Sequence, residues 1–187
     1  MNKKLQKFYA ITDRKQYKKP LLYQIEEILK SKTQMIQIRE KDLSSKDLLS
    51  LCKQIKCIMK KYKNSCLIIN ERVDVAILCG ADGVHLPENS FDVKDIKNKF
   101  PYLIVGKSCH NLECAKKAEK EGADYIVYSP IFYVPNKGKP KGLESLKEVV
   151  NKVKVPVYAL GGINKNNIEE IFNTGVFGVA GIRLFLQ

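Results

Sequence analysis

Eight apolar segments of three to five residues, separated by stretches of helical pattern, constrain the fold of this 187-residue chain more than any other feature. We expect strands at Phe8–Thr12, Met35–Arg39, Leu67–Asn70, Gly83–His85, Leu103–Gly106, Tyr125–Tyr128, Val155–Ala159 and Gly178–Gly181. Strands that alternate with helices indicate a parallel sheet, because each crossover between parallel strands takes a helix. Eight such strands close most simply into a TIM (β/α)₈ barrel.

The stretches between these segments carry apolar residues at helical spacing. After the second strand, for example, Leu48, Cys52 and Ile55 recur every three or four residues. Ser44 and Asn111 stand where helix N-caps are expected. We therefore expect one barrel domain over residues 1–187. An open doubly wound sheet is the alternative, but no GxGxxG motif follows an early strand to favour it.

The chain is short for a barrel of roughly 250 residues. Only Ile182–Gln187 follow the eighth predicted strand, so the last helix is expected to be truncated or absent. That would leave apolar surface around Leu184, Phe185 and Leu186, which a second subunit could cover. A homodimer is therefore one expectation.

Composition narrows the class of protein. Hydrophobic residues make up 44% of the chain, which excludes a disordered protein. No apolar run approaches the roughly 20 residues of a membrane span. The first residues lead directly into a strand and not into the longer apolar region of a signal peptide. We expect a cytoplasmic protein with no membrane partner.

The net charge of +13 is typical of nucleic-acid-binding proteins, which are the second functional class that the sequence suggests. The lysines are spread over nearly every helical segment, however, and no element gathers them together with aromatic residues. We expect no specific nucleic-acid partner. The six cysteines contain no CxxC pair, so neither a zinc site nor a disulfide framework is expected.

The second predicted strand and the loop after it carry polar residues in period two. Gln37, Arg39 and Lys41 alternate with residues that can be buried, and they lead out of the strand's C-terminal end. In TIM barrels this end of the strands builds the active site, and a cationic pair there suggests a phosphorylated ligand. The alternative is that Arg39 and Lys41 are solvated surface charges.

Glycines mark the ends of the last two strands. Gly161 and Gly162 follow the seventh strand, and Gly178 and Gly181 bound the eighth. Glycine lets backbone N–H groups approach a phosphate closely, at the place where barrels often bind one. A simple turn is the alternative for Gly161 and Gly162. Lys137, in a Pro- and Gly-rich loop after strand six, is a further candidate phosphate ligand.

His85 and His110 are the two histidines, so a histidine acid or base would have to be one of them. His85 lies among apolar neighbours, and no carboxylate partner is evident for either residue. A structural, hydrogen-bonded role is the favoured interpretation.

The order and spacing of these motifs resemble the thiamine phosphate synthase/TenI superfamily of barrel enzymes, over nearly the whole chain. The matching stretches are Phe8–Asp13, Gln37-x-Arg39-x-Lys41, Leu67–Asn70, Asp82–Leu86, Gly106-Lys107-Ser108, Gly122–Tyr125, Pro130-Ile131-Phe132, Lys137 and Ala159–Ile163.

The resemblance implies a role for each matched residue. In the synthase, Mg²⁺ and a cationic cluster bind the diphosphate of a hydroxymethylpyrimidine, which leaves as a carbocation forms, and the nitrogen of a thiazole phosphate attacks that cation. By position, the diphosphate set is Gln37, Arg39, Lys41, Asn70, Ser108 and Lys137. The thiazole phosphate set is Gly161, Gly162, Gly181 and Arg183, where Arg183 replaces a serine that is usual in the family.

The chain departs from the synthase pattern at both metal positions. The family has an Asp directly after the strand-three Asn and a second Asp after the His-Leu motif, and here those places hold Glu71 and Ser90. Glu71 could still reach Mg²⁺, whereas Ser90 is a poor ligand for a hard cation.

The stretch from His85 to Phe91 is closer to the TenI branch, whose members move a proton on a carboxylated thiazole phosphate and need no metal. Their catalytic histidine, however, aligns with Pro130. The leading hypothesis is a TenI-like tautomerase without a cofactor, in which a partly buried Glu71 with a raised pKa moves the proton. The alternatives are an Mg²⁺-dependent thiamine phosphate synthase and a non-catalytic phosphate-binding barrel. The candidate catalytic residues are Glu71, Lys41 and Ser108.

Overall fold

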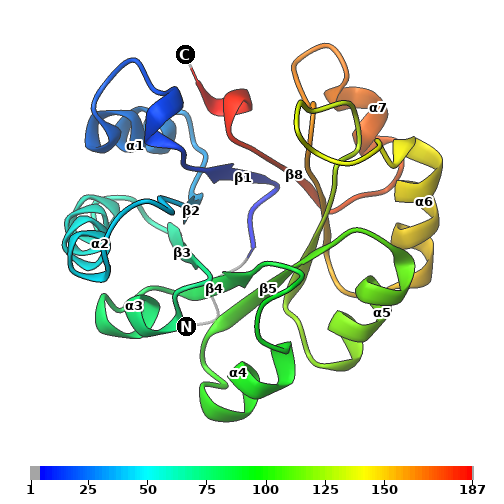
Figure 1. Ribbon diagram of the computed structural model, residues 1–187. Helices are drawn as coiled ribbons and strands as arrows, with labels where there is room; N and C mark the ends of the chain where they lie inside the picture. The colour runs from blue at the N-terminus through cyan, green and yellow to red at the C-terminus, as the bar shows by residue number, and fades with distance from the viewer. Residues whose placement is uncertain (1–4, 187) are drawn as a thin grey trace.

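The computed structural model describes residues 5–186, and these form a closed barrel of eight parallel strands in sequence order, β1 to β8. Figure 1 looks down into the barrel, with the helices around its outside. The strands are β1 (Phe8–Ile11), β2 (Met35–Ile38), β3 (Cys66–Asn70), β4 (Gly83–Leu86), β5 (Ile104–Cys109), β6 (Tyr125–Tyr128), β7 (Val157–Ala159) and β8 (Gly178–Gly181). The predicted TIM barrel and its eight strands are confirmed, and the open sheet is excluded.

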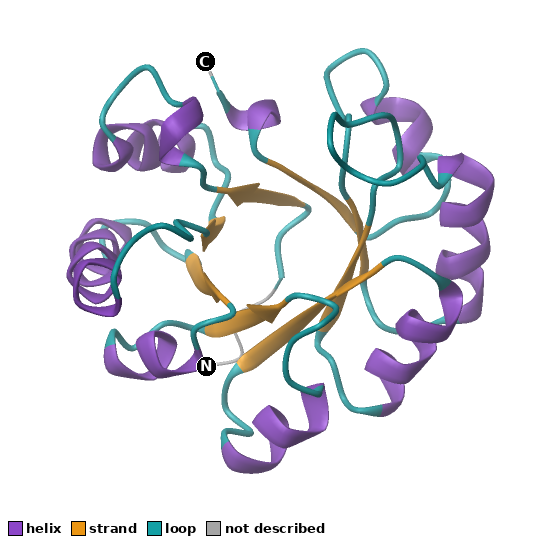
Figure 2. Cartoon of the chain, viewed as in Figure 1, coloured by secondary structure: helices purple, strands orange, loops and turns teal. Residues whose placement is uncertain are grey.

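A helix follows each of the first seven strands, and together the helices form the outer layer (Figure 2). They are α1 (Leu21–Lys30), α2 (Ser45–Met59), α3 (Val73–Leu78), α4 (Val93–Lys99), α5 (Leu112–Lys120), α6 (Gly142–Lys152) and α7 (Ile168–Phe172). Both predicted caps are present. The Ser44 side chain accepts from the backbone N–H of Asp47, and the Asn111 side chain accepts from that of Cys114.

Inside the barrel, alternate residues of the strands pack into a cluster of their own. It contains Tyr9, Ile11, Met35, Cys66, Ile68, Tyr125, Val127, Tyr158 and Ala180. Residues of opposite parity, such as Ile36, Leu67 and Val105, face the helices and belong to other clusters. Because side chains alternate along a strand, the two that follow Met35 on the inner face are Gln37 and Arg39.

Glycines make room for the large rings inside the barrel. A Cβ added at Gly178 would lie 2.8 Å from Cε1 of Tyr158 and 2.3 Å from the carbonyl oxygen of Lys7. Tyr158 is fully buried, and its hydroxyl donates to the carbonyl of Gln6 at 2.6 Å. The eighth strand is therefore glycine-bounded partly for packing reasons, independently of any ligand.

A single 3₁₀ turn, Arg183–Phe185, stands where an eighth helix would lie, between α1 and α7 (Figure 1). Gln24 Nε2 donates to the carbonyl of Phe185 at 3.3 Å, and the Phe185 ring meets Phe8 edge-on at 6.5 Å. Leu184, Phe185 and Leu186 are half-buried. The expected reduction of the last helix is thus seen in the described residues, while the final residue, Gln187, lies outside them.

Among the helices of residues 5–186, none has the length and the apolar character that crossing a bilayer would take.

Candidate active site at the C-terminal rim

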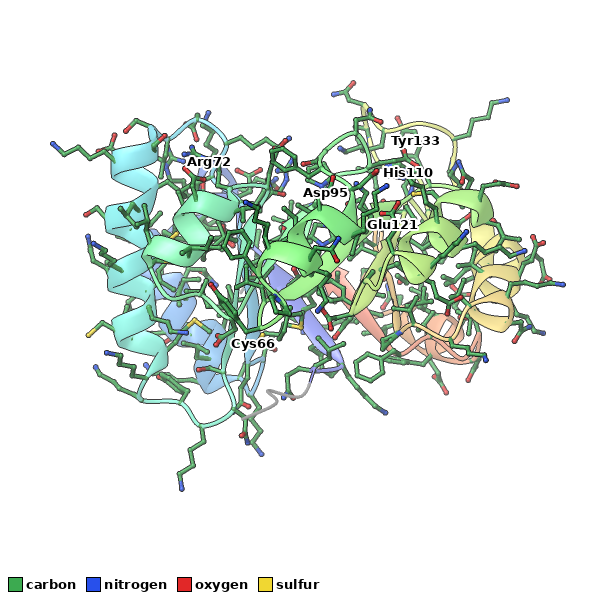
Figure 3. All side chains as sticks on the ribbon, turned by 90° about the horizontal axis from the view of Figure 1, so that it is seen from below. Cys66, Arg72, Asp95, His110, Glu121 and Tyr133 are labelled. Atoms are coloured by element: carbon green, nitrogen blue, oxygen red, sulfur yellow. The ribbon has the colours of Figure 1, made fainter. Side chains whose placement is uncertain are left out.

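The C-terminal ends of all eight strands meet at one rim of the barrel, as parallel pairing requires. Figure 3 shows this rim from the side. Arg72, His110 and Tyr133, which follow β3, β5 and β6, lie toward one edge, and Cys66 at the start of β3 lies toward the other. The sequence-predicted residues of β2, β3 and β5 belong to the same rim, because each lies at or just after the end of its strand.

Gln37 is buried inside the barrel, with 1% of its surface exposed. Its Nε2 donates to the Tyr9 hydroxyl at 2.7 Å, and the Tyr9 hydroxyl lies 2.8 Å from that of Tyr125. Both tyrosines are fully buried, and burial raises the pKa of each well above its ordinary value, so both carry their protons. The polar residue between two isoleucines is thus explained by a buried hydrogen-bond network.

His85, at the end of β4, continues this network to β5. Its Nδ1 lies 3.3 Å from the Tyr125 hydroxyl, and its Nε2 lies 2.8 Å from Ser108 Oγ. Burial, followed by the charges of Lys107 and Arg39, lowers the pKa of His85 to about 3. His85 is therefore a neutral, hydrogen-bonded imidazole at ordinary pH, in agreement with the structural role favoured from the sequence.

Arg39 and Lys41 extend from the rim directly after β2. Arg39 is half-buried and Lys41 is exposed. Within residues 5–186 neither side chain forms an ion pair or a hydrogen bond. Asn70, at the end of the neighbouring β3, is 9% exposed, and its register partner is His85. These groups remain available to an anionic ligand.

The carboxylates next to Arg39 and Lys41 are engaged elsewhere. Arg14 donates to Glu40 Oε2 at 2.9 Å and to both oxygens of Asp42 at 2.7 and 2.8 Å. These hydrogen bonds, first from Arg14 and then from Lys15, hold the pKa of Asp42 well below its usual range. Arg14 thus pairs with the carboxylates that would otherwise compete with a ligand for Arg39 and Lys41, the two cations after β2.

Glu71 follows β3 in a left-handed conformation, with φ of 62°. Its backbone N–H donates to the His85 carbonyl at 2.8 Å, and its side chain is exposed. The prediction that this carboxyl is partly buried is wrong, because the residue sits in a left-handed turn with its side chain in solvent.

The described residues do not form a ready-made metal cage. No group of three or more His, Cys, Asp or Glu side chains within residues 5–186 could hold a metal ion. Mg²⁺, however, commonly takes one or two carboxylates and receives its other ligands from substrate phosphates and water. Glu71 can supply one carboxylate. The site therefore fits an Mg²⁺ ion that arrives with a diphosphate, and does not fit a resident ion.

Lys107 is a buried cation near the place of the second family Asp. Its side chain leaves β5 on the outer face, and Nζ donates to the Phe91 carbonyl at 2.9 Å and lies 3.5 Å from that of Ser90. The ammonium group thereby fixes the loop after β4.

The glycines after β7 have conformations that other residues rarely adopt. Gly161 and Gly162 have φ of 105° and 68°. A Cβ at Gly161 would lie 2.8 Å from Pro130, and one at Gly162 would lie 2.6 Å from the Cβ of Phe132. The Gly162 carbonyl accepts from Asn167 Nδ2 at 3.0 Å. This tight packing of the loops after β6 and β7 requires glycine whether or not phosphate binds there.

The remaining predicted ligands lie at or beyond the ends of β6 and β8. Gly181 is buried at the end of β8, and Arg183 is exposed in the turn after it. Lys137 is exposed in the long loop after β6. Pro130, which aligns with the TenI histidine, is buried and follows a cis peptide bond. The structure thus supplies no histidine at that position.

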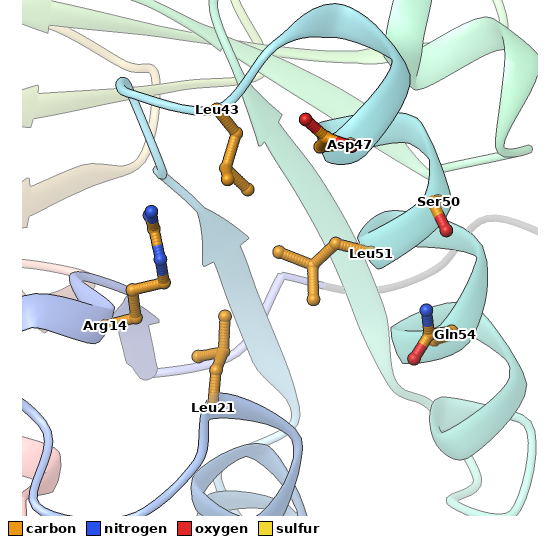
Figure 4. Close-up of a pocket in the computed structure, with 7 residues that line it drawn as sticks. All are labelled: Arg14, Leu21, Leu43, Asp47, Ser50, Leu51 and Gln54. Atoms are coloured by element: carbon orange, nitrogen blue, oxygen red, sulfur yellow. The ribbon is translucent and has the colours of Figure 1, made fainter.

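A hollow outside the barrel lies between α1 and α2 and is separate from the rim residues predicted from the sequence (Figure 4). Its lining residues are Arg14, Leu21, Leu43, Asp47, Ser50, Leu51 and Gln54.

Known proteins resemble this chain over nearly its whole length. The family model described as "Thiamine monophosphate synthase" matches residues 8–185. A "Putative thiamine-phosphate synthase 2" of Aquifex aeolicus is 50% identical over 185 residues, which are 98% of this chain and 99% of the relative. A "Thiamine-phosphate synthase" of Pyrococcus furiosus is 38% identical, over 94% of this chain and 84% of that protein.

A solved structure agrees as well. That of a "Thiamine phosphate pyrophosphorylase from Pyrococcus furiosus" superposes with a TM-score of 0.88 at 38% identity, and covers 95% of this chain and 85% of that one. The family resemblance inferred from the sequence is confirmed: this chain belongs to the thiamine monophosphate synthase family, and it is an enzyme of the thiamine pathway.

Proposed function

We propose that this protein is a thiamine phosphate synthase, which couples hydroxymethylpyrimidine diphosphate with thiazole phosphate and releases diphosphate. The observation that carries the proposal is the pair of cations after β2, Arg39 and Lys41, on the same rim as Asn70 and Ser108. Their neighbouring carboxylates are engaged by Arg14 and do not neutralise them.

The reaction breaks a C–O bond, and the electron pair of that bond leaves on the diphosphate. Cations and hydrogen-bond donors that contact the diphosphate lower the free energy of the transition state, because negative charge accumulates on the leaving group. Arg39, Lys41, Ser108 and the amide of Asn70 would supply these contacts. The thiazole nitrogen then forms the new C–N bond with the pyrimidine methylene carbon.

The second substrate is placed at the other side of the rim in this proposal. Backbone N–H groups of the loops after β7 and β8 would bind the phosphate of the thiazole, and exposed Arg183 would add a charge-assisted contact. When Mg²⁺ is bound with the diphosphate, it neutralises part of the leaving group's charge. Glu71 would hold it from the protein side.

The TenI-like tautomerase remains an alternative, but the structure supports it less. Pro130 offers no acid or base, and the side chain of Glu71 is exposed, whereas the tautomerase hypothesis needs it partly buried beside the substrate. A non-catalytic binding barrel is the second alternative, and only a measurement of turnover distinguishes it from the two enzymes.

The test is an assay with the purified protein, hydroxymethylpyrimidine diphosphate, thiazole phosphate and Mg²⁺. Thiamine phosphate formed above a heat-killed control, and lost when Mg²⁺ is chelated, is the expected result. Conversion of the carboxylated thiazole phosphate without Mg²⁺, together with no coupling, would favour the tautomerase. No turnover of either kind, with thiazole phosphate still bound, would favour the binding barrel.

A further inference from the structure

Five side chains form a continuous hydrogen-bonded path through the barrel, from β2 to β5. We call this path the interior chain; its members in order are Gln37, Tyr9, Tyr125, His85 and Ser108. The three middle members are at most 4% exposed, and Ser108 at its end is half-buried at the rim. The interior chain therefore links the buried Gln37 to Ser108, one of the proposed diphosphate ligands, through residues that lie below the rim.

The order of donors along the interior chain follows from its first member. Gln37 donates its amide N–H to the Tyr9 hydroxyl. Within residues 5–186 the Tyr9 hydroxyl has one other partner, Tyr125, so the Tyr9 proton points to Tyr125 and the Tyr125 proton to the remaining acceptor, His85 Nδ1. Each hydroxyl accepts from the preceding residue and donates to the following one.

His85 transmits this order because it is neutral. A neutral imidazole carries one proton, and a nitrogen that accepts a hydrogen bond leaves the proton on the other. With Nδ1 accepting from Tyr125, Nε2 bears the proton and donates to Ser108 Oγ at 2.8 Å.

The hydroxyl of Ser108 is left with its own proton to donate. Within residues 5–186 the Ser108 Oγ has no hydrogen-bond partner other than His85. A serine hydroxyl that accepts one strong hydrogen bond, and whose own proton has no acceptor among the described residues, can donate that proton to a ligand. Anionic phosphate oxygens accept hydrogen bonds and donate none, so this polarity matches such a ligand.

We propose that the interior chain presets the Ser108 hydroxyl as a hydrogen-bond donor to the bound diphosphate group, and that Tyr125 is a positioning residue acting through His85. This inference rests on the proposed function for the identity of the ligand. The proton order itself belongs to the free protein and can be measured without turnover.

The first experiment reads the tautomer of His85 by ¹⁵N NMR of the ligand-free protein at neutral pH. The expected result is a proton on Nε2 and none on Nδ1. A proton on Nδ1 would reverse the order of donors, turn Ser108 into a donor to His85, and overturn the proposal. This measurement is independent of whether the protein is a synthase.

The second experiment compares Tyr125→Phe with Tyr128→Phe. Both changes remove one hydroxyl from a buried β6 tyrosine and keep the ring. The Tyr128 hydroxyl bonds Ser145 Oγ at 2.7 Å on the helix side and lies outside the interior chain, so Tyr128→Phe controls for lost packing and stability. Affinity for inorganic diphosphate with Mg²⁺ is measured by calorimetry for both variants and the wild type.

We expect Tyr125→Phe to weaken diphosphate binding by about five- to tenfold, the effect of one mispositioned hydrogen bond, and Tyr128→Phe to stay within about twofold of the wild type. In the coupling assay Tyr125→Phe should raise the KM for the pyrimidine diphosphate and leave the KM for thiazole phosphate unchanged. A purely structural role would raise both. Equal diphosphate affinity in the two variants would overturn the proposal.

The two proposals can fail separately. If the wild type binds diphosphate and shows the Nε2–H tautomer but forms no thiamine phosphate, the synthase proposal fails and the role of the interior chain stands. If coupling is efficient and Tyr125→Phe leaves diphosphate affinity unchanged, the synthase proposal stands and the interior-chain proposal fails.

Discussion

The ring of Tyr125 occupies the space beside Gly106, where a Cβ would lie 2.0 Å from Tyr125 Cζ and 2.5 Å from its hydroxyl oxygen. The glycine of the Gly106-Lys107-Ser108 motif is thus required by a side chain of the next strand. Ser108, two residues after Gly106 on β5, belongs to the proposed diphosphate site. One short strand therefore contains both a glycine required for packing and a proposed ligand.

This contact predicts the effect of Gly106→Ala. The added methyl group must push the Tyr125 ring aside, which we expect to lower the free energy of unfolding by about 1–3 kcal/mol and to weaken diphosphate binding. Gly138→Ala is the control, since nothing lies within 4 Å of a Cβ there. Urea unfolding of both variants measures the difference. Equal stability would mean that the barrel accommodates the methyl group without moving Tyr125.

Gly162→Ala should affect the proposed thiazole phosphate site. An alanine at φ of 68°, with its Cβ 2.6 Å from that of Phe132, would shift the loop after β7, and we expect the KM for thiazole phosphate to rise about tenfold or more. Gly175→Ala imposes similar backbone strain, at φ of 85°, but its Cβ has 3.5 Å to Val150 and lies away from the rim. If both variants showed the same rise in KM, the effect would come from general destabilisation.

Much of the fold could be predicted from the sequence, because short apolar segments alternating with helical patterns have few solutions. Gln37 is an instructive case. The sequence predicts Gln37 on a polar edge that faces an anionic ligand, whereas the structure buries its side chain inside the barrel, where Nε2 donates to a protein partner. The partner, Tyr9, could not be identified, because it lies on another strand and looks like an ordinary core residue.

Other features of the site depend on geometry that the sequence does not encode locally. The Tyr9–Tyr125 contact joins residues 116 positions apart, and only closure of the barrel brings them together. Glu71 is predicted to be partly buried beside the substrate, whereas it lies in a left-handed turn with its side chain exposed. Lys107 lies next to Ser108 in the sequence, yet its side chain turns outward and donates to the Phe91 carbonyl in the loop after β4.

Arg39→Gln should weaken binding of the diphosphate substrate. The side chain has no competing carboxylate within the described residues, so its loss removes a charge-assisted hydrogen bond to the ligand, worth about 10- to 100-fold in affinity. Lys152→Gln, at the C-terminal end of α6, removes the same charge at the opposite end of the barrel. Calorimetry with inorganic diphosphate and Mg²⁺ at fixed salt separates the two. A similar loss in both variants would point to general attraction by the net charge of +13.

Glu71→Gln tests the metal side of the proposed function. If this carboxylate holds Mg²⁺ on the diphosphate, its loss should raise the Mg²⁺ concentration for half-maximal coupling by about tenfold, while saturating Mg²⁺ restores much of the activity. Glu148→Gln on the exposed face of α6 controls for the change in charge. Unchanged Mg²⁺ dependence would remove Glu71 from the site. Lost turnover in a metal-free tautomerase assay would instead support its role as a proton carrier.

The neutral state of His85 predicts a decline of stability in acid. In the unfolded chain its imidazole takes up a proton below a pKa of about 6.5, whereas in the folded protein the pKa is lowered to about 3, first by burial and then by Lys107 and Arg39. Between these values the unfolded state binds one more proton at this residue, so its contribution to stability is present above pH 6.5 and is lost as the pH falls. The slope from this group approaches about 1.4 kcal/mol per pH unit. Urea unfolding at pH 7, 6, 5 and 4 should therefore show a shallower decline in His85→Gln than in the wild type. Equal slopes would mean that folding does not lower the pKa of His85.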